Sequence, residues 1–242
     1  MTGWIREYLA NKEEYLKIFD GAMQQEQEQN VEFLENSITK ITGRKYAVAC
    51  SNGTDALHFA LISLGIKPGD EVLTTQFSWI STASCISMVG ATPVFCEINI
   101  LNYHMDLDSI KRMYSSKVKA IVYPHLFGNM SDTKEIIDFC KEKNIAFIED
   151  AAQSLGFSLN GVQAGSIGDI STLSFNANKV VAGEQSQYKI CLLILEQQLQ
   201  NNPHKKLRTE LIHHQFQEHL LQQVSTEEPR YQPLLIQQSL LH

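Results

Sequence analysis

Between Tyr46 and Ile148 the chain alternates short apolar runs with longer segments of helical periodicity, and this alternation limits the possible folds more than any other feature. Turn sequences such as Pro68-Gly69-Asp70 separate the two kinds of segment. Strands that alternate with helices of roughly 10 to 15 residues are typical of βαβ units, so we predict an α/β protein with a mostly parallel sheet. The expected strands are 47–50, 71–75, 93–96, 120–123 and 146–148, and the expected helices are 31–38, 56–64, 80–89, 106–114 and 131–143.

Composition and charge indicate an ordinary globular protein and disfavour two classes of partner. The 242 residues are 43% hydrophobic and 19% charged, as in a soluble domain. The net charge of -7 is unlike the basic surface that binds nucleic acid. No run approaches the ~20 apolar residues of a membrane span, and the N-terminus has no apolar signal core. We therefore expect a cytoplasmic protein that binds neither nucleic acid nor a membrane.

The composition changes after Gly183. All 13 glycines lie at or before that residue, whereas the last 59 residues hold 12 glutamines and five of the eight histidines. An α/β domain that needs glycine turns does not normally stop needing them part-way along the chain. We therefore predict a domain over 1–184 and a divergent tail over 185–242 with no recognisable domain. This tail has three explanations: a divergent end, an end like that of an alternative splice form, or a shifted reading frame.

Metal and disulfide sites are not expected. The five cysteines are an odd number, are widely scattered and include no Cys-x-x-Cys pair, which favours reduced thiols buried in apolar segments. His213, His214 and His219 could suggest a metal site, but no coherent fold is predicted there to hold the ligands. The cysteines are Cys50, Cys85, Cys96, Cys140 and Cys191.

Polar and aromatic residues follow several of the predicted strands, at the sheet edge where α/β proteins bind ligands. Ser51-Asn52-Gly53-Thr54-Asp55 joins a strand to a helix, and free N–H groups at a helix start suit a phosphate. The alternative is plain capping of that helix by Thr54. Phe77-Ser78-Trp79 follows the next strand, where an aromatic ring can either stack on a flat heteroaromatic ligand or pack into the core.

Two further residues suggest covalent chemistry. Lys179 lies between amides and small apolar residues, in Ser174-Phe175-Asn176-Ala177-Asn178-Lys179. Partial desolvation lowers the pKa of a lysine and makes its amine nucleophilic, as Schiff-base chemistry requires; the alternative is an exposed lysine after a strand. Asp150 ends an apolar strand, where it either meets a ligand or caps the next segment. A lysine with an acid that can hold a pyridine nitrogen is the pair that pyridoxal phosphate requires.

Taken in order, these stretches resemble the DegT/DnrJ/EryC1/StrS family of sugar aminotransferases. The resemblance runs from about residue 3 to residue 184. It implies the three-layer large domain of a pyridoxal-phosphate-dependent transferase of fold type I. The matching motifs are 46–57, Gly69-Asp70-Glu71-Val72, Phe77-Ser78-Trp79-Ile80-Ser81-Thr82-Ala83, 90–95, 125–132, Glu149-Asp150-Ala151-Ala152-Gln153-Ser154, Gly165-Ser166-Ile167-Gly168-Asp169 and 174–179.

The resemblance also implies a role for each matching residue. Lys179 would bond covalently to pyridoxal 5'-phosphate and then move the proton, and Asp150 would pair with the pyridinium nitrogen. Trp79 would stack on the ring, and Gln153 would lie near the ring hydroxyl. The phosphate would be held by Gly53, Thr54, Asp55 and Ser174, with the N–H groups of Thr54 and Asp55 as donors and Asn178 as an additional contact to phosphate or substrate.

The reaction implied by the family is the transfer of an amino group to a nucleotide-linked keto-deoxy sugar, with glutamate as the usual donor. Its product would serve amino-sugar synthesis for a cell-surface polysaccharide or an antibiotic. Some relatives have histidine in place of the lysine and act as dehydratases, so Lys179 favours transamination. Sites of the family lie at a dimer interface, so we expect a homodimer. An NAD-binding protein is the weaker alternative, since no Gly-x-Gly-x-x-Gly follows a strand.

The sequence departs from the family pattern near its end. After Gly183-Glu184 the family has two further glycines, but here Gln185 follows. The smaller C-terminal domain that closes over the substrate is not recognisable, and we expect a strand of the main sheet to be missing with it, which would expose an apolar edge. We expect this chain to keep the catalytic lysine but to turn over poorly or not at all. The alternative is a truncated, impaired chain that acts at most as a partner subunit.

Overall fold

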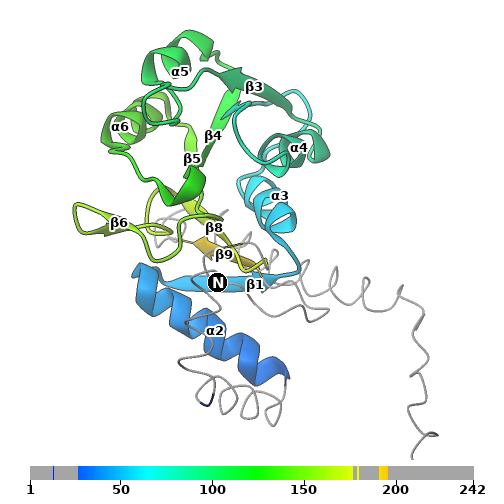
Figure 1. Cartoon of the computed structure of the whole chain (residues 1–242). Helices are drawn as coiled ribbons and strands as arrows, with labels where there is room; N and C mark the ends of the chain where they lie inside the picture. Colours follow the sequence, from blue (N-terminus) through cyan, green and yellow to red (C-terminus); the bar gives the residue numbers. More distant parts are fainter. Residues whose placement is uncertain (1–12, 14–26, 177–178, 180–190, 196–242) are drawn as a thin grey trace, which may run out of the picture. The chain divides into compact units, whose positions relative to one another are not determined.

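The computed structural model describes residue 13, residues 27–176, residue 179 and residues 191–195, and it shows an α/β fold (Figure 1). The helices are α2 (Gln27–Thr42), α3 (Gly53–Ser63), α4 (Ser81–Met88), α5 (Leu107–Met113) and α6 (Lys134–Lys143), with a 3-10 turn η1 (Leu126–Gly128). The strands are β1 (Tyr46–Cys50), β2 (Glu71–Thr75), β3 (Thr92–Cys96), β4 (Val118–Pro124), β5 (Ala146–Asp150), β6 (Ser158–Leu159), β7 (Val162–Gln163), β8 (Ile170–Ser174) and β9 (Cys191–Leu195).

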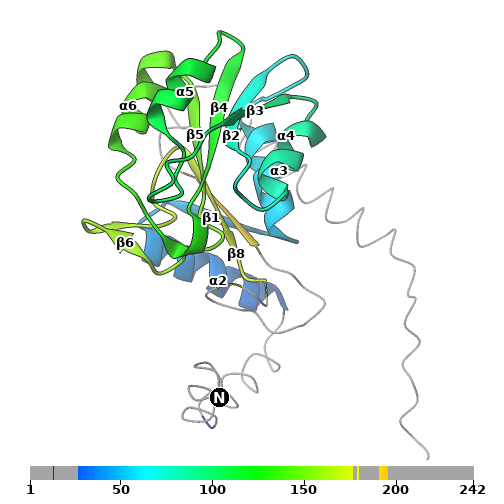
Figure 2. The same cartoon turned by 45° about the horizontal axis from the view of Figure 1, so that its top comes forward.

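The main sheet has the order β1-β9-β8-β5-β4-β2-β3. Strands β3, β2, β4, β5 and β8 pair in parallel, and only β9 runs antiparallel to its neighbours β1 and β8. Helices α3 and α4 cover one face of the sheet and α5 and α6 cover the other, which gives three layers (Figure 2). The predicted mostly parallel sheet and the predicted strands and helices between residues 46 and 148 are confirmed.

Alternation along β5 assigns its side chains to the two faces of the sheet. Phe147 belongs to a buried apolar cluster with Ile136 and Phe139 of α6. Glu149, two residues on, therefore lies on the same face, whereas Asp150 lies on the face of α3 and α4. The two adjacent carboxylates thus have different surroundings, which the site below depends on.

Strand β9 lies beyond the predicted boundary at residue 184. It occupies the position between β1 and β8 and pairs with both, from Tyr46↔Leu195 to Cys50↔Cys191 and from Ile170↔Leu195 to Ser174↔Cys191. Residues after 184 thus supply a strand of the main sheet, which corrects the expectation that a strand of this sheet is missing. Residues 196–242 lie outside the described residues. The division into a cofactor-binding domain and a divergent tail stays a prediction.

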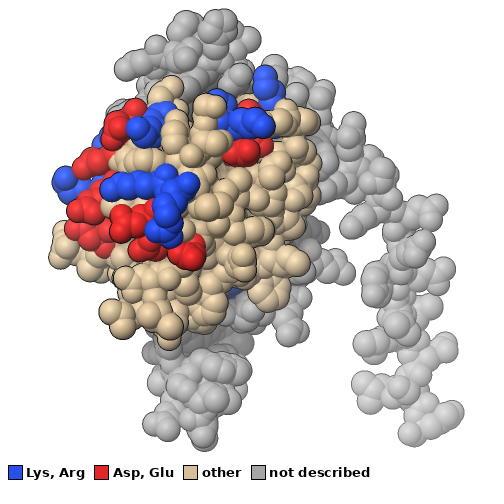
Figure 3. Space-filling view, turned by 90° about the horizontal axis from the view of Figure 1, so that it is seen from above, with Lys and Arg blue, Asp and Glu red and all other residues tan. Residues whose placement is uncertain are grey.

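Charged side chains on the surface are interspersed in sign. On the face shown in Figure 3, lysine and arginine lie beside aspartate and glutamate on one side, and the rest of that face carries few charges. Exposed ion pairs join Arg112 to Glu97 at 2.7 Å and Lys134 to Asp138 at 3.0 Å. Such pairs contribute at most about 1 kcal/mol each to stability. None of the described helices combines the length and the apolar character needed to cross a membrane.

The turn before β8 gives a test of the packing on β5. Gly168 has φ +78°, and a Cβ there would lie 2.4 Å from Phe147 Cδ1 and 2.6 Å from the Phe147 carbonyl oxygen. Gly161, in the β6–β7 turn, has φ +79° but nothing within 4 Å of such a Cβ. Both Gly→Ala substitutions cost about 1–2 kcal/mol through the left-handed backbone. We expect Gly168→Ala to cost about 1–3 kcal/mol more, through overpacking.

Urea unfolding of the two variants measures this difference. Equal losses of unfolding free energy would contradict the close contact between Gly168 and β5.

Candidate functional site

A cavity of about 230 Å³ opens at the carboxyl ends of the parallel strands. It lies where α3 and α4 begin and where β4, β5 and β8 end. The structure brings most of the predicted site residues together here, although they are far apart in the sequence. Those that line the cavity are Gly53, Thr54, Trp79, Asp150, Gln153, Ser174 and Lys179.

The start of α3 forms one wall of the cavity. The first N–H groups of a helix lack partners within it. The side chain of Asn52 accepts a hydrogen bond from the N–H of Asp55 at 2.9 Å, and Asn52 is therefore the N-cap. The N–H groups of Gly53 and Thr54, which line the cavity, remain as donors for an anion.

Asp55 lies outside the cavity, contrary to the expectation that its N–H holds a phosphate. That N–H is engaged by the Asn52 side chain, and the Asp55 carboxylate accepts hydrogen bonds from Ser51 and Asn52. The sequence predicted a cap by Thr54 as the alternative to a phosphate site, and the cap is formed by Asn52 instead.

Hydroxyl groups gather near the same helix start. Thr54 Oγ1 lies 2.6 Å from Ser81 Oγ, which links the first turn of α3 to that of α4. Ser174 ends β8, is buried and accepts a hydrogen bond from the N–H of Asn176 at 3.5 Å. These hydroxyls and the α3 N–H groups form a polar wall of the kind that holds a phosphate.

Asp150 forms the acidic floor of the cavity. Its Oδ1 accepts a hydrogen bond from the N–H of Ala152 at 3.1 Å, and its Oδ2 accepts one from Thr82 Oγ1 at 3.3 Å. Burial raises the pKa of Asp150, and the Ala152 N–H, the charge of Lys179 and the Thr82 hydroxyl each lower it. The carboxylate is thus largely desolvated, and a cationic partner would stabilise its ionised form.

Lys179 lines the cavity with Asp150 and is partly buried. Its N–H donates to the carbonyl of Asn176 at 2.8 Å. The alternative was an exposed lysine after a strand; Lys179 does follow β8, but it is only partly exposed. Asn178, predicted as an additional contact, lies outside the described residues.

Trp79 and Gln153 lie at two other edges of the cavity. Trp79 is 67% exposed, so it is not a core residue. Its ring is therefore accessible to a ligand. Gln153 Oε1 accepts a hydrogen bond from the N–H of Phe127 at 2.9 Å, which fixes the side chain to the turn after β4. Stacking by Trp79 and contact between Gln153 and a ring hydroxyl stay predictions.

On the opposite face of the sheet, Glu149 is completely buried and well satisfied. It accepts hydrogen bonds from the N–H groups of Gly165 and Ile167, each at 2.8 Å, and from Ser171 Oγ at 2.7 Å. His125 Nε2 lies 3.1 Å from Glu149 Oε1, and the N–H of His125 donates to the Asp150 carbonyl at 3.0 Å. Glu149 therefore ties the end of β4 and the turn before β8 to β5, and so supports the frame around Asp150.

Several residues that had no role predicted from the sequence lie at the site. Ser78, Ser81, Thr82, His125 and Asn176 all line the cavity. The signal for Ser81 and Thr82 was their place at the start of a predicted helix that follows a strand. A hydroxyl at the start of a helix is usually interpreted as an N-cap, so its contact with a carboxylate distant in the chain is not predicted from the sequence.

Metal ligation has no support in the described residues. Within them, no cluster of three or more His, Cys, Asp or Glu side chains could hold a metal ion. Cys50, Cys85, Cys96 and Cys140 are buried, and burial raises the pKa of the last three to about 12. The Cys191 side chain and the histidines of the tail, His213, His214 and His219, are not among the described side chains.

The chain matches one known protein family over most of its length. A model of the DegT/DnrJ/EryC1/StrS aminotransferase family matches residues 10–184, which is more than half of the chain. The chain belongs to this family. As a DegT/DnrJ/EryC1/StrS protein it has the expected fold, and the cavity lies at the positions that the family motifs indicated.

Three relatives illustrate this membership. GDP-perosamine synthase of Caulobacter vibrioides is 38% identical over 151 residues, which cover 62% of this chain and 40% of that protein. UDP-N-acetyl-3-dehydro-alpha-D-glucosamine 3-aminotransferase of Acidithiobacillus ferrooxidans is 39% identical, over 60% of this chain and 40% of that protein. The pyridoxal-phosphate form of a putative sugar aminotransferase from Streptococcus pneumoniae is 26% identical with a TM-score of 0.65, over 74% of this chain and 48% of that one. The chain thus spans less than half of each relative, and the expected low turnover stays a prediction.

Proposed function

We propose that this DegT/DnrJ/EryC1/StrS chain binds pyridoxal 5'-phosphate and serves the transamination of a nucleotide-linked keto-deoxy sugar. The observation that carries the proposal is that Lys179 and the buried Asp150 line one cavity, beside the start of α3. The solved relative from Streptococcus pneumoniae in its pyridoxal-phosphate form supports the choice of cofactor.

Residues that line the cavity are candidates for the contacts that this cofactor requires. Gly53, Thr54 and Ser174 would hold its phosphate at the polar wall, and Trp79 would cover its ring. Asp150 would keep a proton on the ring nitrogen. When bound, the cofactor supplies a protonated ring that withdraws electrons from the carbon under attack.

Lys179 would hold the cofactor covalently and, once displaced by the amino donor, would act as the base that moves the proton. Lys179 lines the same cavity as Asp150 and is partly buried, so its amine is among the groups that would contact the cofactor.

The substrate is inferred from chemistry that two relatives have in their names. One makes GDP-perosamine and the other aminates a UDP-linked 3-keto glucosamine derivative. We propose that the amino acceptor here is likewise a keto sugar on a nucleotide, that glutamate is the amino donor, and that the protein is cytoplasmic.

Covalent capture tests the proposal. The protein is incubated with pyridoxal phosphate, reduced with borohydride and digested, and the modified peptide is identified by mass spectrometry. We expect one reduced cofactor per chain, on Lys179. Modification scattered over exposed lysines, with Lys179 unmodified, would refute the proposal.

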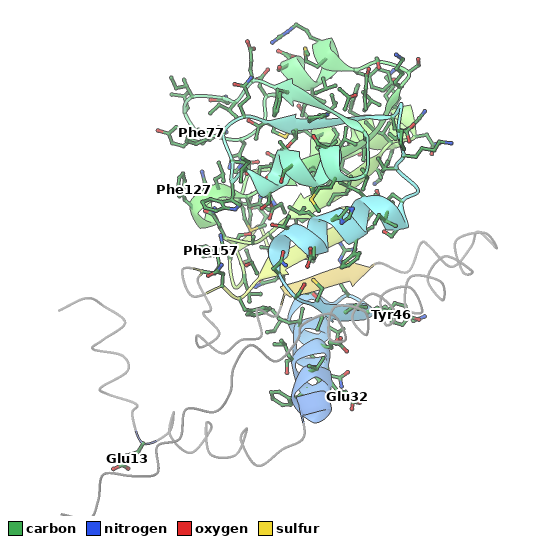
Figure 4. All side chains as sticks on the ribbon, turned by 90° about the vertical axis from the view of Figure 1, so that its right-hand side faces the viewer. Glu13, Glu32, Tyr46, Phe77, Phe127 and Phe157 are labelled. Atoms are coloured by element: carbon green, nitrogen blue, oxygen red, sulfur yellow. The ribbon has the colours of Figure 1, made fainter. Side chains whose placement is uncertain are left out.

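We further propose that the chain forms a homodimer through an apolar rim beside the cavity. The rim consists of exposed large apolar residues on the loops after four strands, β2, β3, β4 and β5: Phe77, Trp79, Ile80, Ile100, Leu101, Tyr103, Phe127 and Phe157. Figure 4 shows Phe77, Phe127 and Phe157 on one side of the described chain. The Phe77 ring lies 5.5 Å from that of Tyr103 and 6.4 Å from that of Phe127. Exposed apolar side chains that gather on one side of a protein mark an interface, and Trp79, which belongs to both the rim and the cavity lining, supports a second copy as the partner.

A charge in this rim should separate the copies. Phe127 is 73% exposed and has φ +57°, a backbone conformation that aspartate tolerates better than phenylalanine. We expect Phe127→Asp to convert a dimer to a monomer in sedimentation velocity, with the fold retained. Phe33 on α2 is 72% exposed, so Phe33→Asp is the matched control that should leave the dimer intact. An unmodified chain that sediments as a monomer would contradict the dimer.

A further inference from the structure

The hydrogen bond between Thr82 and Asp150 joins two segments far apart in the chain. Thr82 lies in the first turn of α4, is 1% exposed and lines the cavity. Its Oγ1 donates to Asp150 Oδ2 at 3.3 Å, while the N–H of Ala152 donates to the other oxygen.

Thr82 also forms a hydrogen bond with a second hydroxyl, that of Ser78. Ser78 Oγ lies 2.7 Å from Thr82 Oγ1. Each hydroxyl has one proton, and an ionised carboxylate can only accept. If Thr82 donates its proton to Asp150, Ser78 must donate to Thr82. The result is a directed chain from Ser78 through Thr82 to Asp150, built on the loop after β2 and the start of α4.

We propose that Thr82 is a positioning residue whose hydroxyl, oriented by Ser78, keeps the Asp150 carboxylate ionised and turned toward the pyridine nitrogen of the cofactor. The inference rests on the proposed function, because it assigns a role to Thr82 only if pyridoxal phosphate occupies the cavity. A threonine that merely filled space in the first turn of α4 would need neither a hydroxyl nor a second hydroxyl that donates to it.

The surroundings of Asp150 determine the direction of the expected pH effect. The groups facing it are Lys179 after β8, His125 after β4, and Thr82 and Cys85 on α4; the Cys85 thiol, with a pKa of about 12, is neutral. Burial raises the pKa of Asp150, and the Thr82 hydroxyl is among the groups that lower it. Without that hydroxyl the pKa rises further, so the carboxylate becomes protonated, and loses its attraction for a pyridinium, at a higher pH.

The test is the pH dependence of pyridoxal-phosphate affinity, measured by titration of the cofactor absorbance. In Thr82→Val we expect affinity near pH 7 to fall roughly tenfold and the midpoint of its decline toward acid to move up by about one unit. Thr82→Ser, which keeps the hydroxyl, should restore the unmodified profile, and Ser78→Ala should shift it in the same direction as Thr82→Val. Thr42→Val removes a buried hydroxyl outside the cavity and should have no effect on the profile.

The outcomes separate the two levels of inference. If the unmodified protein binds pyridoxal phosphate and the profile of Thr82→Val coincides with it, the role of Thr82 is refuted and the proposed function stands. If Thr82→Ser behaves like Thr82→Val, shape and not the hydroxyl matters, and the role is again refuted. If the unmodified protein binds no pyridoxal phosphate, the proposed function fails and this inference fails with it.

Discussion

Replacing Lys179 with alanine should abolish covalent attachment of pyridoxal phosphate and lower amino transfer from glutamate by at least roughly 10³-fold. Both losses have one cause, since the same amine bonds to the cofactor and moves the proton. The readouts are the mass of the borohydride-reduced protein and the 2-oxoglutarate released from glutamate. Urea unfolding of Lys179→Ala shows whether the fold is retained, so that loss of attachment can be assigned to the missing amine.

Two controls make this result specific to Lys179. Lys117 is exposed in the turn before β4, and Lys117→Ala should still be labelled on Lys179. Added ethylamine should partly restore 2-oxoglutarate release in Lys179→Ala, because a free amine can replace the missing base. Equal labelling of Lys179→Ala and the unmodified protein would refute the assignment.

Replacing Asp150 with asparagine should have opposite effects on cofactor binding and on the stability of the cofactor-free protein. The substitution keeps the shape but removes the charge that faces the pyridinium. Loss of one partner from a buried charge pair costs about 2–5 kcal/mol, which is at least a roughly 30-fold loss of pyridoxal-phosphate affinity. Titration of the cofactor absorbance measures it.

The effect on stability follows from the sign of the pKa shift. Burial raises the pKa of Asp150 above its value in the unfolded chain, so the stability that this group contributes is complete at low pH and is lost as the pH rises through the folded-state pKa. Without cofactor, Asp150→Asn should therefore be at least as stable as the unmodified protein at pH 7. The buried carboxylate thus lowers folding stability while it raises cofactor affinity, as is common at functional sites.

Asp169 provides the matched control for Asp150. Its Oδ2 accepts a hydrogen bond from the Phe147 N–H at 2.9 Å, and it does not line the cavity. Asp169→Asn should cost about 1–2 kcal/mol of unfolding free energy and leave pyridoxal-phosphate affinity unchanged. A cofactor-free Asp150→Asn protein that is less stable than Asp169→Asn would contradict the desolvated state of Asp150.

The sequence predicted those parts of the fold and site that have local signals. Alternating periodicity located the strands from β1 to β5, and the position of Asp150 and Trp79 after strands placed both at the sheet edge that binds ligands. Lys179 was predicted from its neighbours and from its relation to Asp150. In each case the relevant information lies within a few residues or in the order of elements.

The parts that were missed depend on partners distant in the chain. The apolar run of β9 has no neighbouring turn signals, and only its pairing with β1 and β8 makes it a strand. The donor role of Thr82 requires α4 to pack beside the end of β5. Asp55 was assigned to the phosphate because nothing in the sequence shows that Asn52, and not Thr54, caps α3.

The position of β9 between β1 and β8 determines when the sheet can be completed during synthesis. Within the described residues β1 pairs with β9 alone, and some 140 residues separate these two strands in the sequence. The first strand to leave the ribosome must therefore wait for the last described strand before it gains a partner. Such a late closure slows folding and leaves a nascent chain open to misassembly. A nascent chain stalled before residue 191 should accordingly bind chaperones, whereas one extended past residue 195 can complete the sheet.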